Sequence, residues 1–319
     1  MEALTFGPVP SRRLGRSLGI NNIPPKTCSL SCVYCQLGRT LTMRVERGTF
    51  FTPEAIVAAV SERLAACARA SEAVDALTVV PDGEPTLDES LGRTLEALRS
   101  FGHKVAVITN ATLLWCDAVR DDLAQADWVS VKVDAVRDEP WHAVGRPHGR
   151  LRLPGVLEGI RAFARGFPGE LVTETMLVAG VNDSDDHLRQ LSAFLGDLVP
   201  SIAYLAVPIR PPAEQWVKPP DPDRLVAGYR ILAERLPRVE LLADQPKGGP
   251  ARTGGLVDDL LAITAVHPLN DSAVVQLAGG DAEGLEVAES LVARGLLASA
   301  RFAGDRFFVR RFQRERKPA

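Results

Sequence analysis

The chain has 319 residues, of which 46% are hydrophobic and 24% are charged, and its formal charge at pH 7 is −3. This composition predicts a globular protein with a substantial core, and it excludes a disordered chain and a protein that coats a polyanion over its whole surface. We expect a cytosolic protein that does not enter a membrane, because no apolar run reaches the roughly 18 residues that cross a bilayer and the first residues lack the apolar stretch of a secretory signal.

Six segments rich in β-branched and apolar residues predict strands. They cover residues 17–23, 75–80, 103–109, 128–134, 170–178 and 201–209. Helical patterns separate them, and the first is marked by Thr52-Pro53-Glu54, where an N-cap precedes a proline and an acid of the first turn. The other helices are predicted to begin near Asp88, Leu113, Leu153, Asp183 and Asp221.

Strands that alternate with helices in this way predict a parallel sheet covered by helices. We therefore predict an α/β fold in which residues 1–245 form a partial (β/α)6 TIM-like barrel. The reactive face of such a barrel lies at the carboxyl ends of its strands.

The alternation ends near residues 245–250, a segment rich in glycine and proline that is typical of a linker. Three short helical patterns follow, over residues 256–264, 272–277 and 285–292, and two strand-like runs then flank Gly304-Asp305. This order predicts a small winged-helix-like C-terminal domain over residues 246–319. Residues 1–50 and 301–319 each contain seven basic and two acidic residues, so both ends of the chain favour an anionic partner.

The five cysteines divide into a group of three and two isolated residues. Cys28, Cys32 and Cys35 follow the first predicted strand with C-x3-C-x2-C spacing, whereas the apolar neighbours of Cys67 and Cys116 favour core positions. An odd number of cysteines argues against a disulfide scaffold. Three thiolates in one loop can hold three irons of a [4Fe–4S] cluster and leave the fourth iron open. The alternatives are a structural zinc ion, which usually needs a fourth Cys or His, and thiols without a metal.

Polar residues mark the ends of the second and third predicted strands. The second ends in Asp82-Gly83-Glu84, where a glycine permits close approach to the backbone and carboxylates can accept hydrogen bonds from an ammonium group. The third ends in Asn110. Each segment is either a ligand-binding loop or an ordinary turn, because Asp, Gly and Asn also favour turns.

The fourth and fifth predicted strands carry polar residues on one face. Ser130, Lys132 and Asp134 share a face by the period of two, and so do Glu174 and Met176. Charged side chains on central strands are costly unless they are paired or face a ligand. They therefore predict either a binding site, at which Glu174 and Met176 contact a ligand or substrate, or internal ion pairs of Lys132 with Asp134 or Glu174.

The cysteine spacing, with Tyr34 before the third cysteine, resembles that of the radical S-adenosylmethionine (SAM) superfamily. Residues 7–19 and 26–40, in which GPVPSRRLGRSLG precedes KTCSLSCVYCQLGRT, resemble a branch of Fe–S oxidoreductases related to the wyosine-forming tRNA enzyme. The resemblance implies that the three cysteines hold the cluster and that Tyr34 lies against the adenine of SAM. It also implies SAM contacts by Asp82, Gly83, Glu84, Asn110, Ser130, Lys132 and Asp134. Asp82 replaces the first glycine of the family's Gly-Gly-Glu-like motif.

The resemblance further implies an enzyme in which one [4Fe–4S] cluster cleaves SAM reductively to a 5′-deoxyadenosyl radical, which abstracts a hydrogen atom from tRNA, a peptide or a metabolite. The electron would come from a flavodoxin or ferredoxin, because the flavodoxin-like domain of some relatives is missing. Arg210, after the sixth predicted strand, is a further candidate for contact with SAM or substrate. No catalytic acid or base follows from the sequence.

The alternative is an iron- or redox-responsive regulator that binds nucleic acid through the winged helix. Its recognition helix would lie near residues 285–292. Residues 284–294 contain two glutamates and a single arginine, which is a poor set for contacts with phosphates.

Overall fold

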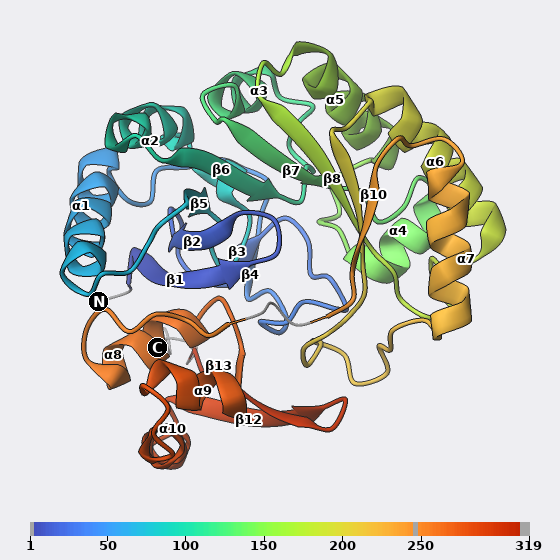
Figure 1. Cartoon of the computed structure of the whole chain (residues 1–319). Coiled ribbons are helices and arrows are strands. Elements are labelled where there is room, and N and C mark those ends of the chain that lie inside the picture. Colours follow the sequence, from blue (N-terminus) through green and yellow to red (C-terminus); the bar gives the residue numbers. More distant parts are fainter. Residues whose placement is uncertain (1–2, 245–247, 313–319) are drawn as a thin grey trace, which may run out of the picture.

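The computed structural model describes residues 3–244 and 248–312. Its largest element is an eight-stranded sheet that curls like a half-barrel, with helices on its outer face (Figure 1). In sheet order, the strands are β1 (Thr5–Ser11), β2 (Gly15–Ile20), β5 (Ala76–Val79), β6 (Lys104–Thr109), β7 (Trp128–Lys132), β8 (Glu170–Met176), β9 (Ile202–Ala206) and β10 (Val239–Leu242).

The six predicted strands are β2 and β5 to β9, and they lie side by side and parallel in the order of the sequence. The predicted α/β architecture is confirmed. Two further strands extend the sheet: β1 pairs with β2 in the antiparallel sense, and β10 pairs with β9 in the parallel sense. Strand β1 contains Pro8 and Pro10, which weaken the strand signal in the sequence but are tolerated at a sheet edge.

The helices of the half-barrel are α1 (Pro53–Arg69), α2 (Leu91–Leu98), α3 (Asp117–Leu123), α4 (Asp138–Gly145), α5 (Leu153–Gly166), α6 (Asp185–Leu198) and α7 (Pro222–Ala233). Thr52 caps α1 by accepting from the Ala55 backbone N–H, as predicted, and Asp221 caps α7 in the same way. Short 3-10 turns cover Pro85–Leu87 and Arg99–Phe101. Helix α4 was not predicted, and α3 begins later than expected because residues 112–115 form turns.

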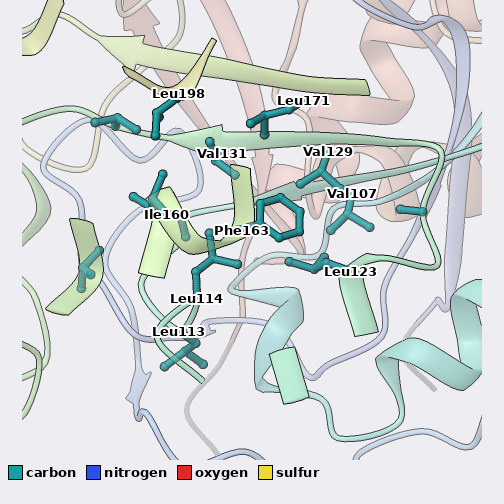
Figure 2. Packing of buried hydrophobic residues seen from close by; sticks show 14 of the residues in the cluster. Val107, Leu113, Leu114, Leu123, Val129, Val131, Ile160, Phe163, Leu171 and Leu198 are labelled. Carbon is teal, nitrogen blue, oxygen red and sulfur yellow. The ribbon is translucent and has the colours of Figure 1, made fainter. Parts of the chain in front are cut away.

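The main core lies between the sheet and the helices (Figure 2). Val107, Val129 and Val131 project from neighbouring strands onto Ile160 and Phe163 of α5. Cys67 is buried in this cluster and Cys116 packs against it, as predicted for the two isolated cysteines. A second cluster fills the inside of the curl, and its buried members are Leu14, Ala76, Ala106, Trp128, Val172, Ile202, Tyr204, Ala206 and Leu242.

The C-terminal part contains the predicted three helices and hairpin. Its elements are α8 (Leu256–Thr264), β11 (Leu269–Asn270), α9 (Asp271–Leu277), α10 (Glu283–Ala293), β12 (Leu297–Phe302) and β13 (Asp305–Arg310). The three strands form an antiparallel sheet in the order β11-β13-β12. Residues 245–247 of the predicted linker and the basic residues Arg314, Arg316 and Lys317 lie outside the described residues.

The C-terminal part packs against strand β1, at the edge of the half-barrel (Figure 1). Phe6 and Val9 of β1 belong to the same apolar cluster as Leu260, Ile263 and Phe308. The Ala251 backbone N–H donates to the Pro8 carbonyl at 3.0 Å, so one carbonyl group at the edge of the sheet has a hydrogen-bond partner. In the described part of the chain, no helix is both long and apolar enough to cross a membrane.

Candidate active site at the carboxyl ends of the strands

A cavity of about 380 Å³ lies at the carboxyl ends of the parallel strands, where the reactive face was predicted. Its walls come from the loop that carries Cys28, Cys32 and Cys35, called the cysteine loop below, and from the segments at the ends of β5 to β9. The turn between β1 and β2 and Val266 and His267 of the C-terminal part complete them. The predicted site residues that line it are Cys28, Cys32, Tyr34, Cys35, Asp82, Gly83, Glu84, Asn110, Lys132, Glu174, Met176 and Arg210. Ser130 and Asp134 are not among the lining residues.

The cysteine loop is folded back on itself and anchored at both ends. Cys28 ends β3 (Thr27–Cys28), which pairs with β4 (Thr42–Met43). The Cys35 backbone N–H donates to the Cys32 carbonyl at 3.1 Å and closes a turn between the two cysteines. The Val33 backbone N–H donates to the carbonyl of Val144 in α4 at 2.9 Å. These bonds bring the three thiols to one cavity from a short stretch of chain.

Burial raises the pKa of all three thiols, and that of Cys32 rises to about 12. The charges of Glu84 on Cys28 and of Asp134 on Cys32 add to this effect, whereas Lys132 opposes it at Cys32 and Cys35. The free thiols are therefore protonated at neutral pH, and metal binding would displace their protons. Among the described residues, no three Cys, His, Asp or Glu side chains are grouped so as to hold a single metal ion. A cubane places each thiolate on a different iron, so a wider arrangement of three thiols is compatible with it.

The ring of Tyr34 is fixed between two charged residues of the fourth predicted strand. Its hydroxyl donates to Asp134 Oδ2, and Lys132 Nζ lies 4.9 Å from the ring centroid, as in a cation–π contact. Asp134 Oδ1 in turn accepts from the Met176 backbone N–H at 2.8 Å. Asp134 thus fixes the positions of Tyr34 and Met176, which both line the cavity.

Lys132 pairs with Glu174, its Cα partner on the neighbouring strand, and not with Asp134. Lys132 Nζ donates to Glu174 Oε1 at 2.7 Å, and Arg13 donates to Glu174 Oε2. Burial alone would raise the pKa of Glu174, but the charges of Lys132 and Arg13 outweigh it and lower that pKa to about 2. Glu174 therefore stays ionised and neutralises its two basic neighbours.

The segment Asp82-Gly83-Glu84 packs against the backbone of Thr27, at the start of the cysteine loop. A Cβ at Gly83 would lie 1.9 Å from the Thr27 carbonyl oxygen, so the close approach that requires glycine is to the chain itself. The Glu84 backbone N–H donates to the same carbonyl at 3.0 Å. Gly83 therefore sets the position of Cys28.

The two carboxylates of this segment differ in what they bind. Glu84 is buried, and it accepts from the Thr109 hydroxyl at 2.6 Å and from the Asn110 backbone N–H at 2.7 Å. Asp82 Oδ2 forms an ion pair with Lys26 Nζ at 3.2 Å and has no other side-chain partner within the described residues. Burial, opposed by Lys26, raises the pKa of Asp82 to about 6. Both residues line the cavity, and Asp82 has the fewer partners of the two.

Several residues that line the cavity were not predicted as site residues: Arg12, Arg13, Lys26, Gln36 and His267. Arg12 and Arg13 form the turn between β1 and β2, and the sequence interpretation took them only as part of a basic stretch. Their place in the run that resembles the Fe–S oxidoreductase branch was a signal that could have identified them. His267 lies far along the chain from the other lining residues, and no local pattern marks it.

Residues 22–191 match the family model described as the radical SAM superfamily. A UPF0026 protein of Methanocaldococcus jannaschii is 39% identical over 309 residues, and the match covers 96% of each chain. Among solved structures, a radical SAM methyltransferase from Sphaerobacter thermophilus is similar with a TM-score of 0.58 and 19% identity, over 72% of this chain and 66% of that one. TYW1 with a lysine-pyruvate adduct is similar with a TM-score of 0.53 and 13% identity, over 69% of this chain and 74% of that one.

At these identities the two structures show a shared fold alone. The family model and the long UPF0026 match show which family the chain belongs to, and they confirm the resemblance inferred from the cysteine motif. Members of this superfamily use an iron–sulfur cluster and SAM, and the cavity of this chain carries the three thiols of the motif. The chain belongs to the radical SAM superfamily, as an enzyme of its UPF0026 family.

Proposed function

We propose that Cys28, Cys32 and Cys35 hold one [4Fe–4S] cluster and that SAM binds beside it in the cavity. When bound, cluster and SAM supply a 5′-deoxyadenosyl radical that abstracts a hydrogen atom from the substrate. The observation that supports this most directly is that all three thiols line a single cavity at the carboxyl ends of the strands.

The protein's own residues would position SAM and exclude water. Asp82, which lines the cavity beside Lys26, would accept from the amino group of SAM through a carboxylate whose only side-chain partner is Lys26. Tyr34, held by Lys132 and Asp134, would pack against the adenine. Asn110, whose Nδ2 lies 3.5 Å from Cys28 Sγ, would contact the ribose or carboxylate. Gly83, Glu84 and Ser130 would act by shaping the loops and strands behind these contacts.

The test is anaerobic reconstitution with iron and sulfide, followed by reduction with dithionite in the presence of SAM. The wild-type protein is expected to show the absorption of a [4Fe–4S] cluster and to release 5′-deoxyadenosine and methionine. Cys32→Ala is expected to lose the cluster, because two thiolates remain. Cys116→Ala is the matched control and should keep it, since Cys116 packs against the core. A fully loaded protein that leaves SAM intact, or unchanged iron content in Cys32→Ala, would contradict the proposal.

We further propose that the C-terminal part, residues 246–319, is a winged-helix-like domain that recognises a tRNA or peptide substrate. Support comes from its three helices, its β11-β13-β12 sheet and the position of Val266 and His267 in the cavity wall. The electron would come from a cytosolic flavodoxin or ferredoxin. Cys67 and Cys116 are packed with the core and are not grouped for a second cluster.

Two observations weigh against the alternative of a nucleic-acid-binding regulator. Helix α10 carries Glu286 and Glu289, which repel phosphates. Arg306, at the start of the second hairpin strand, is paired with Asp271 and Glu289 at 2.8 Å each. A salt-dependent shift of duplex DNA, in a loaded protein that does not cleave SAM, would favour the regulator instead.

A further inference from the structure

Arg210 lies where the cysteine loop, the segment after β9 and the C-terminal part meet. Its Nη1 donates to Gln36 Oε1 at 3.0 Å, and its Nη2 contacts His267 Nε2 at 2.9 Å. Its Nε is buried and has no hydrogen-bond partner within the described residues. Both partners are uncharged amide or imidazole groups, so no carboxylate of the described chain neutralises this guanidinium.

The charge of Arg210 is costly in this position. Burial and the neighbouring charge of Arg12 lower the pKa of Arg210 to about 10, which still leaves it ionised at neutral pH. Burial and Arg210 also hold the pKa of His267 well below its usual range, so the imidazole is neutral and accepts the hydrogen bond. A buried cation without a counter-charge is unfavourable unless an anion arrives to pair with it.

Arg12 is the second unmatched cation of the cavity. It lies in the turn between β1 and β2 and makes no hydrogen bond or ion pair with the described residues. Its side chain is exposed, and partial burial together with the charge of Arg13 lowers its pKa. Glu174, one of the two carboxylates that act on Arg12, is already held by Arg13 and Lys132. The other, Asp244, is exposed.

The charges that line the cavity do not balance. Among the described lining residues there are five cations, Arg12, Arg13, Lys26, Lys132 and Arg210, and three carboxylates, Asp82, Glu84 and Glu174. Each carboxylate is engaged by a neighbouring group of the chain. Asp82 pairs with Lys26, and Glu174 is shared by Lys132 and Arg13, whereas Glu84 is held by neutral donors. Arg12 and Arg210 are the two lining cations that have no carboxylate partner among the described residues.

We propose that Arg12 and Arg210 form an oxyanion subsite for the substrate, which therefore carries a phosphate or carboxylate group. The guanidinium of Arg210 has five N–H groups and uses two of them on Gln36 and His267. Three N–H groups of this guanidinium remain without a partner among the described residues, and the Arg210 side chain lines the cavity, where it can donate to the oxygens of an anion. This inference rests on the proposed function, because it takes the cavity to be the substrate site.

The experiment measures the binding of inorganic phosphate and of malonate to the reconstituted protein by calorimetry, at constant ionic strength, with SAM affinity measured in parallel. Saturable binding of one anion is expected, and the preferred anion tells a phosphate substrate from a carboxylate substrate. Arg210→Gln and Arg12→Gln are each expected to weaken that binding at least about tenfold, since each removes charge-assisted hydrogen bonds. Arg189→Gln, an exposed change of the same charge on α6, is the matched control and should leave it unchanged.

Circular dichroism checks that each variant folds. If Arg210→Gln does not fold, Arg12→Gln, which changes a residue on an exposed turn, still tests the subsite. Absence of saturable binding, or equal binding by wild type and variants, overturns the subsite. An equal loss of SAM affinity in the variants also overturns it, because the anion is then the carboxylate of SAM. If the loaded wild type cleaves SAM but fails these tests, the proposed function stands and the subsite falls.

Discussion

At the scale of single residues, the cavity is organised by charges that the chain pairs across neighbouring strands. Lys132 was expected to pair with either Asp134 or Glu174, and the strand register decides for Glu174, its direct Cα partner. Asp134 is instead held by Tyr34 and the Met176 backbone. The sequence could place these residues on one face, because a strand has a period of two, but the choice of partner depends on register, which no local pattern reveals.

The pairing of Glu174 predicts a dependence of stability on pH. Its pKa in the folded protein is about 2, below the ordinary value of 4.5, so the unfolded chain binds more protons between about pH 5 and pH 2. Glu174 therefore contributes stability above this window, and the contribution is lost as the pH falls through it. The shift corresponds to about 3 kcal/mol at pH 7.

We expect Glu174→Gln to lower the free energy of unfolding by about this amount at pH 7, because Lys132 and Arg13 lose their counter-charge. Urea denaturation of both proteins at a series of pH values measures the difference, which should shrink towards pH 2. Glu158→Gln, an exposed residue on α5, is the control. A difference that stays constant over the whole range would contradict the assignment.

At the scale of elements, most strands and helices follow from the sequence, because apolar periodicity and capping act locally. The six central strands and the C-terminal helices were predicted on this basis. Strand β1 was missed because of its prolines, and α4 because Pro140 and a short apolar pattern obscure it. Proline is tolerated in both places, at an edge strand and in a first helical turn. The missed helix matters, because the carbonyls of Val144 and Gly145 accept from backbone N–H groups of the cysteine loop.

Glu214 joins the end of α4 to the cysteine loop, so we expect its ion pairs to hold that loop in place. Its carboxylate accepts from Arg39 Nε at 2.7 Å and from Arg146 Nη1 at 2.5 Å, and its backbone N–H donates to the Val33 carbonyl at 3.0 Å. The hydrogen bonds from Arg39 and Arg146 lower the pKa of Glu214 to about 2, so it is ionised throughout the useful pH range.

Glu214→Ala is expected to free the segment around Cys32 and Cys35, and so to speed the loss of iron from the reconstituted protein to a chelator severalfold. The anaerobic decay of the cluster absorption measures this rate. Glu139→Ala, an exposed acid in the first turn of α4, is the matched control. Equal rates in Glu214→Ala and wild type would show that the ion pairs do not hold the loop.

At the scale of the whole molecule, the cavity is closed by parts of the chain that are distant in sequence. The motif residues meet because parallel strands end at one edge, which the sequence predicts. His267 meets Arg210 only through the packing of the C-terminal part on β1, which depends on tertiary contacts. Thus the catalytic motif could be predicted from sequence, whereas the side of the cavity that faces the C-terminal part could not.

Phe6 is the residue on which this packing can be tested. Its ring is buried, it belongs to the apolar cluster of the C-terminal part, and a Cβ at Gly19 would lie 1.9 Å from it. Phe6→Ala is expected to cost about 3–5 kcal/mol, as large-to-small changes of buried aromatic residues do. Hydrogen exchange should increase selectively over α8 and β13, because these elements lose their contact with β1. Phe163→Ala removes an equally buried ring from the main core, so it should destabilise the protein without that selectivity.

The same change also connects packing to the site. When the C-terminal part loosens, His267 leaves Arg210, and the guanidinium of Arg210 loses one of the two groups that orient it. The affinity for phosphate or malonate should therefore fall in Phe6→Ala but not in Phe163→Ala, under conditions in which both variants remain folded. If exchange over α8 and β13 rises equally in both variants, the half-barrel and the C-terminal part unfold as one cooperative unit, and β1 is not the contact that holds them together.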